Sequence, residues 1–247
     1  MSRAEVAILY APGTNCHEET AAAIERAGGT SELVLLRDLL DGRAKLGDYR
    51  AAAIPGGFAY GDHLGAGRIF GTMLAACLRD QLMEFLDARK PLLGVCNGFQ
   101  VLADAGILSA RSPGKRSMAL LENQSGHFED RKIRLVVSDD KSMWTEGLGG
   151  QVLEMPVGHG EGRPLFCETA PGSTGSPVLR YCDAQGRATN QYPENPNGAP
   201  NGVAGITDET GMILGLMPHP ERASLPAHYS QDGLKLFMNL VRWLRGS

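Results

Sequence analysis

The sequence predicts an α/β fold: an open, mostly parallel central sheet with helices on both faces, extended by antiparallel strands in the second half. Two observations support this prediction. In the first half, short and almost continuous apolar runs alternate with amphipathic helical segments, which is typical of parallel strands buried on both faces. In the second half, apolar runs follow one another with turns between them and little helix. We expect residues 1–247 to form a single domain, because α/β folds of this length are often one unit.

The first half supplies four predicted strands and three predicted helices. Turn residues end several of these segments; the first strand, for example, stops at Pro12 and Gly13. The predicted strands cover Val6–Ala11, Glu32–Leu36, Ala51–Ile54 and Pro91–Val95. The predicted helices cover Glu18–Ala27, Ile69–Leu86 and Asn97–Ala103, and the second of them has a clear helical period of apolar residues.

The second half supplies strands, one long loop and a final helix. The stretch 192–202 is rich in Pro, Asn and Gly and predicts a loop that lies on the surface or shapes a site. The predicted strands cover Ala119–Glu122, Lys132–Val137, Gln151–Pro156, Val178–Tyr181, Val203–Thr207 and Met212–Leu216. The last helix is predicted over Leu234–Leu244, packed on the sheet through its apolar residues, Met238 among them.

Composition narrows the class of protein. The chain has 24 Lys and Arg against 28 Asp and Glu, a formal net charge of −4, so we expect no nucleic acid partner. We find no signal-peptide pattern and no apolar segment long enough to cross a membrane, so we expect no membrane partner. Five scattered cysteines without a CxxC pair favour a reducing cytoplasm and indicate neither a disulfide framework nor a metal site.

The sharpest chemical signal is the segment 94–98, Gly-Val-Cys-Asn-Gly, where an apolar strand runs into a helix. This G-x-C-x-G pattern is the layout of a nucleophile elbow with cysteine in place of serine. Gly94 and Gly98 leave room for the sharp turn, and the start of a helix favours the thiolate form of Cys96. The backbone N–H of Asn97 would face a developing oxyanion. The alternative is that Cys96 is an ordinary buried core cysteine.

A base and its orienting acceptor follow another predicted strand. His219 and Glu221 come shortly after the strand Met212–Leu216 and are separated and preceded by prolines that fix the backbone. A cysteine nucleophile needs such a base, and the base needs a partner that orients it. The alternative is a chance H-x-E pair on the surface.

A third strand ends at Gly56 and Gly57. Parallel strands deliver their carboxyl ends to one rim of the sheet, where ligands of open α/β folds bind. We therefore expect Gly57, Cys96 and His219 to meet there, with glycine amides facing the oxyanion.

These motifs resemble the class I (triad) glutamine amidotransferases, through the segment 94–100 and the downstream His219-Pro220-Glu221. More narrowly, the chain is similar to glutaminase subunits of phosphoribosylformylglycinamidine synthase, from purine biosynthesis. The narrower resemblance rests on further segments across nearly the whole chain: 13–16 (GTNC), 55–62 (PGGFAYGD), 159–163 (HGEGR), 195–198 (NPNG) and 217–222 (MPHPER). The resemblance implies a flavodoxin-like arrangement of the sheet.

The resemblance also implies roles for single residues. Cys96 would be the nucleophile, His219 the general base and then acid, and Glu221 the group that orients it. The remaining implied roles are an oxyanion hole from the backbone amides of Gly57 and Asn97, and glutamine binding by Gln100 and Asn123.

Two further motifs have no clear place in this scheme. His159 and Glu161 form a second H-x-E pair, but no third metal ligand is evident, so we expect a wall of the site or a partner contact. After Phe128 the family usually continues toward Arg-Trp, whereas this chain has Asp130-Arg131-Lys132, so the contacts of that strand are open.

The function that the resemblance implies is hydrolysis of L-glutamine to glutamate and ammonia through a cysteine thioester. The ammonia would pass to a synthetase that converts formylglycinamide ribonucleotide to formylglycinamidine ribonucleotide. The chain has no G-x-x-x-x-G-K-[ST] motif, so we expect ATP and magnesium to be used by that large partner chain, alongside a small accessory chain. Two alternatives stay open: a freestanding cysteine hydrolase or peptidase of the same fold, and a non-catalytic regulatory subunit.

Overall fold

A nine-stranded sheet forms the centre of the computed structural model, which describes residues 5–108, 113–167 and 175–246. The strands of this sheet are β1 (Val6–Tyr10), β2 (Ser31–Leu35), β3 (Ala51–Ile54), β4 (Leu92–Val95), β6 (Glu129–Val137), β7 (Val152–His159), β9 (Ser176–Tyr181), β10 (Val203–Thr207) and β11 (Ile213–Leu216). Their order across the sheet is β2-β1-β3-β4-β11-β10-β9-β6-β7. Two further strands, β5 (Met118–Glu122) and β8 (Glu161–Phe166), pair with each other in a separate small sheet.

Parallel pairing joins the first five strands of that order, and antiparallel pairing joins the rest. Four of these strands, β1, β3, β4 and β11, are almost wholly apolar and buried, as strands covered on both faces must be, whereas the edge strand β2 is partly exposed. The predicted fold class is therefore confirmed, and β10, β9, β6 and β7 are the antiparallel additions. Two second-half strands differ from the prediction: Met212–Leu216 (β11) is parallel to β4, and Ala119–Glu122 (β5) lies in the separate small sheet.

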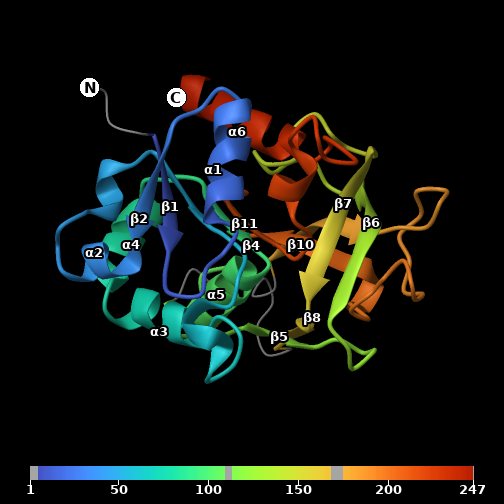
Figure 1. The fold of residues 1–247 in the computed structure, drawn as a ribbon, viewed down its shortest axis with the longest axis horizontal. Helices are drawn as coiled ribbons and strands as arrows, with labels where there is room; N and C mark the ends of the chain where they lie inside the picture. The colour runs from blue at the N-terminus through green and yellow to red at the C-terminus, as the bar shows by residue number, and fades with distance from the viewer. Residues whose placement is uncertain (1–4, 109–112, 168–174, 247) are drawn as a thin grey trace.

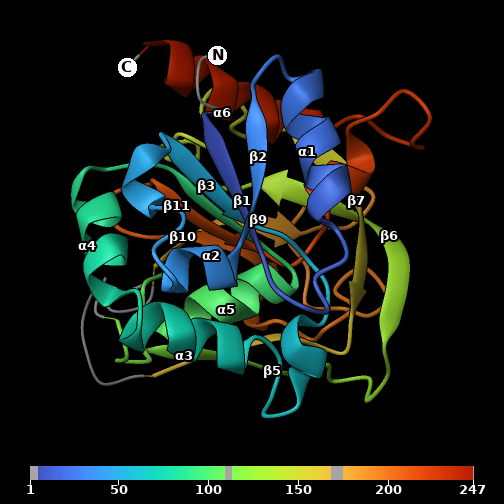
Figure 2. The ribbon, with the colours of Figure 1, turned by 60° about the vertical axis from the view of Figure 1, so that its left-hand side comes forward.

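Helices cover both faces of the sheet (Figures 1 and 2). Figure 1 shows α1 and α6 together on one side of the strands and α3 and α5 on the other. The α-helices are α1 (His17–Arg26), α2 (Leu36–Leu40), α3 (Arg68–Ala76), α4 (Arg79–Asp87), α5 (Asn97–Ala105) and α6 (Leu234–Gly246). None of the helices within the described ranges is long and apolar enough to span a membrane.

The register of the central strands decides where the site lies. β4 sits between β3 and β11, runs parallel to both, and pairs Gly94 with Ile54 and Val95 with Leu216. The strands β3, β4 and β11 therefore end at the same edge of the sheet. The turns that follow them carry Gly57, Cys96 and His219, as the sequence predicted.

Several element predictions were wrong in detail. The helix predicted over Ile69–Leu86 is two helices, α3 and α4, which break at Cys77 and Leu78 while the apolar period continues. The short helix α2 and the strand β8 were not predicted. Met238 of α6 is exposed rather than packed on the sheet.

The predicted loop 192–202 contains no strand. Hydrogen bonds from two buried asparagine side chains hold part of it in place. The buried Asn195 donates to the carbonyls of Thr189 and Ala199, and the buried Asn197 donates to the carbonyl of Gly162. Residues 195–199 are therefore mostly buried, while Tyr192, Pro200 and Asn201 are exposed.

Candidate active site

Cys96 sits at a strained turn between β4 and α5. Its backbone has φ +52° and ψ −106°, in a region that non-glycine residues seldom occupy, and its amide donates to the carbonyl of Leu216 at 2.7 Å. Its thiol is 5% exposed and donates to the carbonyl of Gly158 at 3.4 Å. The strained turn places the sulfur at the amino end of α5, where negative charge is favoured.

The two glycines of the G-x-C-x-G pattern are required by close packing. A Cβ on Gly98 would overlap the carbonyl oxygen of Ile54, and a Cβ on Gly94 would lie 2.6 Å from the carbonyl oxygen of Gly98. The requirement for small residues on both sides of Cys96 is therefore confirmed.

His219 and Glu221 lie side by side beside this turn. The amide of His219 donates to the carbonyl of Pro156 in β7, and Glu221 lies in the short 3-10 helix η4 (Pro220–Ala223). His219 Nδ1 is 2.5 Å from Glu221 Oε1, and both side chains are buried. Since a carboxylate accepts, His219 donates from Nδ1, which leaves Nε2 as the nitrogen that can exchange a proton with Cys96.

The environment of His219 favours its charged form. Burial alone lowers the pKa of His219, but the charges of Glu221 and Cys96 raise it, and the result lies well above the usual value for histidine. A raised pKa makes this imidazole a stronger base toward the neighbouring thiol of Cys96.

The loop after β3 lies against the Cys96 turn and carries the predicted oxyanion donor Gly57. This residue has φ +147°, and a Cβ on it would lie 2.7 Å from the backbone of residues 13–15, so only glycine fits. Asn97 ties the loop to α5, because its side chain accepts from the amide of Ala59 and donates to Asp62. The loop that carries Gly57 is thus fixed against the start of α5.

Cys16 is a residue of the site that sequence reasoning missed. Its buried thiol lies 4.0 Å from His219 Nδ1 and 3.2 Å from the guanidinium nitrogen Nη2 of Arg222. Burial, against the opposing effect of its hydrogen bond with His219, raises the pKa of the Cys16 thiol. Its position in the sequence could have indicated that it lies near the site, because the segment 13–16 follows β1, which pairs directly with β3.

The side chains of Cys16, His219 and Glu221 are also close enough to be considered as metal ligands. Their potential ligand atoms all lie within 4.8 Å of one another. The 2.5 Å contact between His219 and Glu221 is a hydrogen bond, and two atoms bound to one zinc ion would lie farther apart. The geometry of this group is therefore that of a hydrogen bond between His219 and Glu221 rather than of a shared metal ion.

A small cavity of about 110 Å³ connects these residues to the surface. Phe58 and Phe128 line this cavity, and their ring centroids are 6.4 Å apart. The two residues are 50% and 54% exposed. The other residues that line it are Asn15, Cys16, Gly57, Cys96, Asp130, Gly158, His219 and Arg222.

The two predicted substrate-binding residues do not line this cavity. Gln100 donates to the carbonyl of Glu161 at 2.6 Å and accepts from Asn97 at 2.9 Å. Asn123 is buried, and its side chain makes hydrogen bonds with His159 at the turn of β7 and β8 and with the carbonyl of His127. Both residues are close neighbours of the cavity wall rather than part of its surface.

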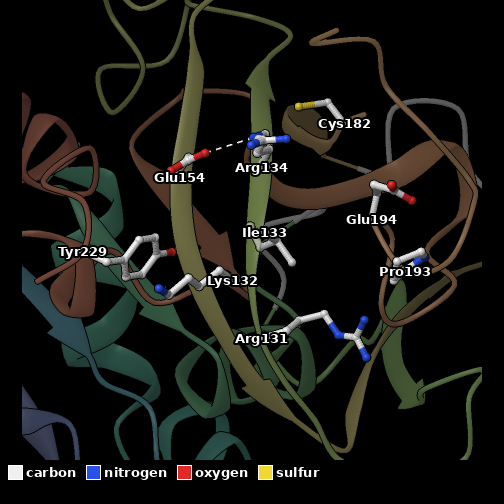
Figure 3. A pocket seen from close by; sticks show the side chains of 9 residues that line it. All are labelled: Arg131, Lys132, Ile133, Arg134, Glu154, Cys182, Pro193, Glu194 and Tyr229. Carbon is white, nitrogen blue, oxygen red and sulfur yellow. Dashed lines mark hydrogen bonds and ion pairs between the residues drawn. The ribbon is translucent and has the colours of Figure 1, made fainter. Parts of the chain in front are cut away.

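The strand that departs from the family pattern borders a second cavity, of about 580 Å³ (Figure 3). Its cations have local partners: Arg131 pairs with Glu129, and Arg134 pairs with Glu154 at 2.9 Å. In Figure 3 Lys132 points toward Tyr229, and its ammonium lies 4.3 Å from the centre of that ring. Because these charges are already matched, we assign no ligand to this cavity.

Comparison with known proteins gives one family and close relatives. Residues 3–244 match the family described as "CobB/CobQ-like glutamine amidotransferase domain". A protein of Dehalococcoides mccartyi named "Phosphoribosylformylglycinamidine synthase subunit PurQ" is 38% identical over 99% of both chains. A protein of Pyrococcus furiosus with the same name is 39% identical over 97% of this chain and 98% of its own.

Solved structures of similar fold include glutamine amidotransferases as well. A chain in "Structure of PurLQS from Thermotoga maritima" is 29% identical, with a TM-score of 0.79 over 98% of this chain and 100% of that chain. A glutamine amidotransferase from Thermotoga maritima is only 15% identical, with a TM-score of 0.58 over 100% of both chains, and shows likeness of fold alone.

Proposed function

The chain belongs to the glutamine amidotransferases, in the group of PurQ subunits of phosphoribosylformylglycinamidine synthase, and from this premise we propose how it works. It hydrolyses L-glutamine to glutamate and ammonia and delivers the ammonia to a synthetase partner. That partner converts formylglycinamide ribonucleotide to formylglycinamidine ribonucleotide in purine biosynthesis.

One observation supports this function most strongly. A cysteine at a strained strand-to-helix turn opens into the same cavity as a buried histidine that is hydrogen-bonded to a glutamate. This is the arrangement of nucleophile, base and orienting acceptor that acyl transfer requires.

In the first half of the reaction Cys96 attacks the side-chain carboxamide carbon of glutamine. His219 takes the proton of the thiol as the sulfur–carbon bond forms and the carbonyl oxygen gains negative charge, and the amides of Gly57 and Asn97 stabilise that charge. His219 then gives its proton to the departing nitrogen. The carbon–nitrogen bond breaks, ammonia leaves, and a γ-glutamyl thioester remains on Cys96.

In the second half water replaces ammonia. His219 takes a proton from the water molecule, whose oxygen attacks the thioester carbonyl at the same oxyanion donors. The carbon–sulfur bond breaks, glutamate leaves, and His219 returns its proton to the sulfur, which restores the thiol of Cys96. Glu221 accepts the hydrogen bond from Nδ1 and so holds His219 in the tautomer that presents Nε2 to the reacting atoms.

Gln100 is the residue that we propose for recognition of glutamine. Its side chain is tied to Asn97 and to the carbonyl of Glu161, so it is held in place before substrate arrives. If the side-chain amide of Gln100 donates to a polar group of the substrate in place of the Glu161 carbonyl, it binds glutamine without a change of its rotamer.

The partners and setting follow from the family. We propose that this chain, as one domain over residues 1–247, works in the cytoplasm with a large synthetase subunit and a small accessory subunit. The synthetase binds ATP and magnesium, and this chain requires no cofactor for the thioester chemistry, which uses only its own side chains.

A glutamine analogue with a diazo-ketone group should alkylate Cys96 and spare Cys16, Cys77, Cys167 and Cys182. Cys16 is the sharpest competitor because it lines the same cavity, but its raised pKa keeps it a thiol. Burial likewise raises the pKa of Cys182 to about 11. Mass mapping of peptides reads the label, and iodoacetamide, which should reach the exposed Cys77 and Cys167, serves as control. Preferential labelling of Cys16 by the analogue would show that the nucleophile is misassigned.

The isolated chain should be a weak glutaminase that the synthetase partner activates. Phe58 and Phe128 at the cavity are half exposed in the chain alone, so water reaches the site. A partner that covers this rim would exclude water and strengthen the interactions at the oxyanion. Glutamate release, measured with and without the synthetase and accessory chains, tests this. Fast release by the isolated chain, unchanged by the partners, would favour the freestanding hydrolase.

A further inference from the structure

Asn123 and His159 form a buried pair beside the catalytic residues, and no step of the mechanism uses them. Asn123 Nδ2 donates to the carbonyls of His127 at 2.9 Å and His159 at 2.7 Å. Its backbone amide donates to the carbonyl of Gly160 at 2.8 Å. Asn123 thus fastens the end of β5 to the turn between β7 and β8.

The same pair is joined by a third side-chain contact, which fixes the state of His159. Its Nδ1 lies 3.0 Å from Asn123 Oδ1. Because both hydrogens of Asn123 Nδ2 go to carbonyls, Oδ1 is the acceptor and His159 Nδ1 carries the proton. Burial, together with the nearby His219, lowers the pKa of His159 to about 3, so the ring is neutral where the enzyme works.

The residue before His159 contacts the nucleophile. The carbonyl of Gly158 accepts the hydrogen bond from the thiol of Cys96 at 3.4 Å. A Cβ on Gly158 would lie 4.0 Å from His219 Nε2, so this residue faces the base as well. Two residues earlier, the carbonyl of Pro156 accepts from the amide of His219. The end of β7 therefore contacts the thiol of Cys96 and the backbone of His219, and the Asn123–His159 pair contacts the end of β7.

We infer that Asn123 and His159 are a positioning pair, which keeps the Gly158 carbonyl against Cys96 and so sets the direction of attack. This inference rests on the proposed role of Cys96 as nucleophile. It gives Asn123 a part other than direct glutamine binding, because both of its side-chain donors and its acceptor are already engaged inside the protein. A shift of about 1 Å in a reacting group can cost roughly 100-fold in rate, so the pair acts on turnover.

Asn123→Ala tests this in the complete complex with the synthetase and accessory chains. We expect kcat for glutamine hydrolysis to fall about 10- to 100-fold and KM to stay within about twofold. Asn195→Ala is the matched control: Asn195 is equally buried and also donates to two backbone carbonyls, but it lies in the loop 192–202 and not on the turn beside Gly158. We expect Asn195→Ala to change stability without changing kcat in the folded fraction.

His159 provides a second, independent comparison. Asparagine can place its Nδ2–H close to the position of a histidine Nδ1–H, so His159→Asn should keep the bond to Asn123 Oδ1, whereas His159→Ala loses it. We expect kcat of His159→Asn within about threefold of wild type and kcat of His159→Ala reduced as in Asn123→Ala. If Asn123→Ala does not form the complex, this pair of variants decides the question alone.

The outcomes separate the positioning role from its alternatives. A rise of tenfold or more in KM for Asn123→Ala, with kcat little changed, would overturn the inference in favour of direct glutamine binding. Unchanged kinetics in Asn123→Ala, or equal loss in His159→Asn and His159→Ala, would overturn it as well. If the wild-type complex released no glutamate, the proposed function itself would fail, and the inference with it.

Discussion

Cys96→Ala should abolish glutamine-dependent synthesis by the complex while synthesis from ammonium salts continues. The loss should be on the order of 10⁴ to 10⁶ in kcat, since removal of a nucleophile leaves only binding and the oxyanion donors. None of the groups around Cys96 serves the synthetase reaction, which we assign to the partner chain. The ratio of ammonia-driven to glutamine-driven rates is the measurement.

The substitution should leave the fold and the assembly intact. The thiol is a small group with one hydrogen bond, to the carbonyl of Gly158, and alanine keeps the Cβ of the turn. Cys77→Ala, at an exposed cysteine far from the chemistry, is the control and should match wild type in both rates. Equal loss of both rates in Cys96→Ala would mean that the assignment of Cys96 is wrong or that the complex fails to assemble. His219→Ala should behave like Cys96→Ala.

Glu221→Gln should lower glutamine-driven kcat by roughly 10²- to 10⁴-fold, because the amide keeps the shape but not the charge that orients and stabilises His219. The buried carboxylate lies 2.5 Å from His219 Nδ1, so its charge acts at short range. Ammonia-driven synthesis by the same complex is the control and should persist.

The pH dependence of this variant has a definite sign. In the wild type burial lowers the pKa of His219, but Glu221 and then Cys96 raise it well above the usual value. His219 therefore keeps the proton that it gives to the departing ammonia until the pH rises through that raised pKa. Without the charge of Glu221 the pKa of His219 must fall, so the alkaline limb of kcat/KM in Glu221→Gln should move to lower pH. An alkaline limb that stayed in place or moved upward would contradict the role of Glu221.

The rim of the sheet could be predicted because its signals are local. Each parallel strand ends at a turn with a distinctive residue, and the parallel direction alone brings Gly57, Cys96 and His219 together. The apolar pattern could not reveal the break between α3 and α4, because the period runs on through Cys77 and Leu78. The sequence did not predict β8 because Gly162 and Pro164 are poor strand formers. The strand can contain them because it pairs with one neighbour only, β5.

The residues behind the triad could not be predicted because tertiary contacts alone define them. Cys16 is far from His219 in sequence, and only the pairing of β1 with β3 brings it near the rim. His159 and Asn123 stand in motifs that resemble the family, but their hydrogen bonds to each other depend on how β5 and β7 are placed. Residue type gave no sign that both would be buried.

The most direct test of covalent catalysis is to quench the wild-type complex rapidly during glutamine turnover and to map the peptides by mass spectrometry. We expect a γ-glutamyl group on the peptide that contains Cys96, absent from His219→Ala and from samples without glutamine. Glutamate release at full rate with no γ-glutamyl group on Cys96 at any time, or with the group on Cys16, would contradict the mechanism.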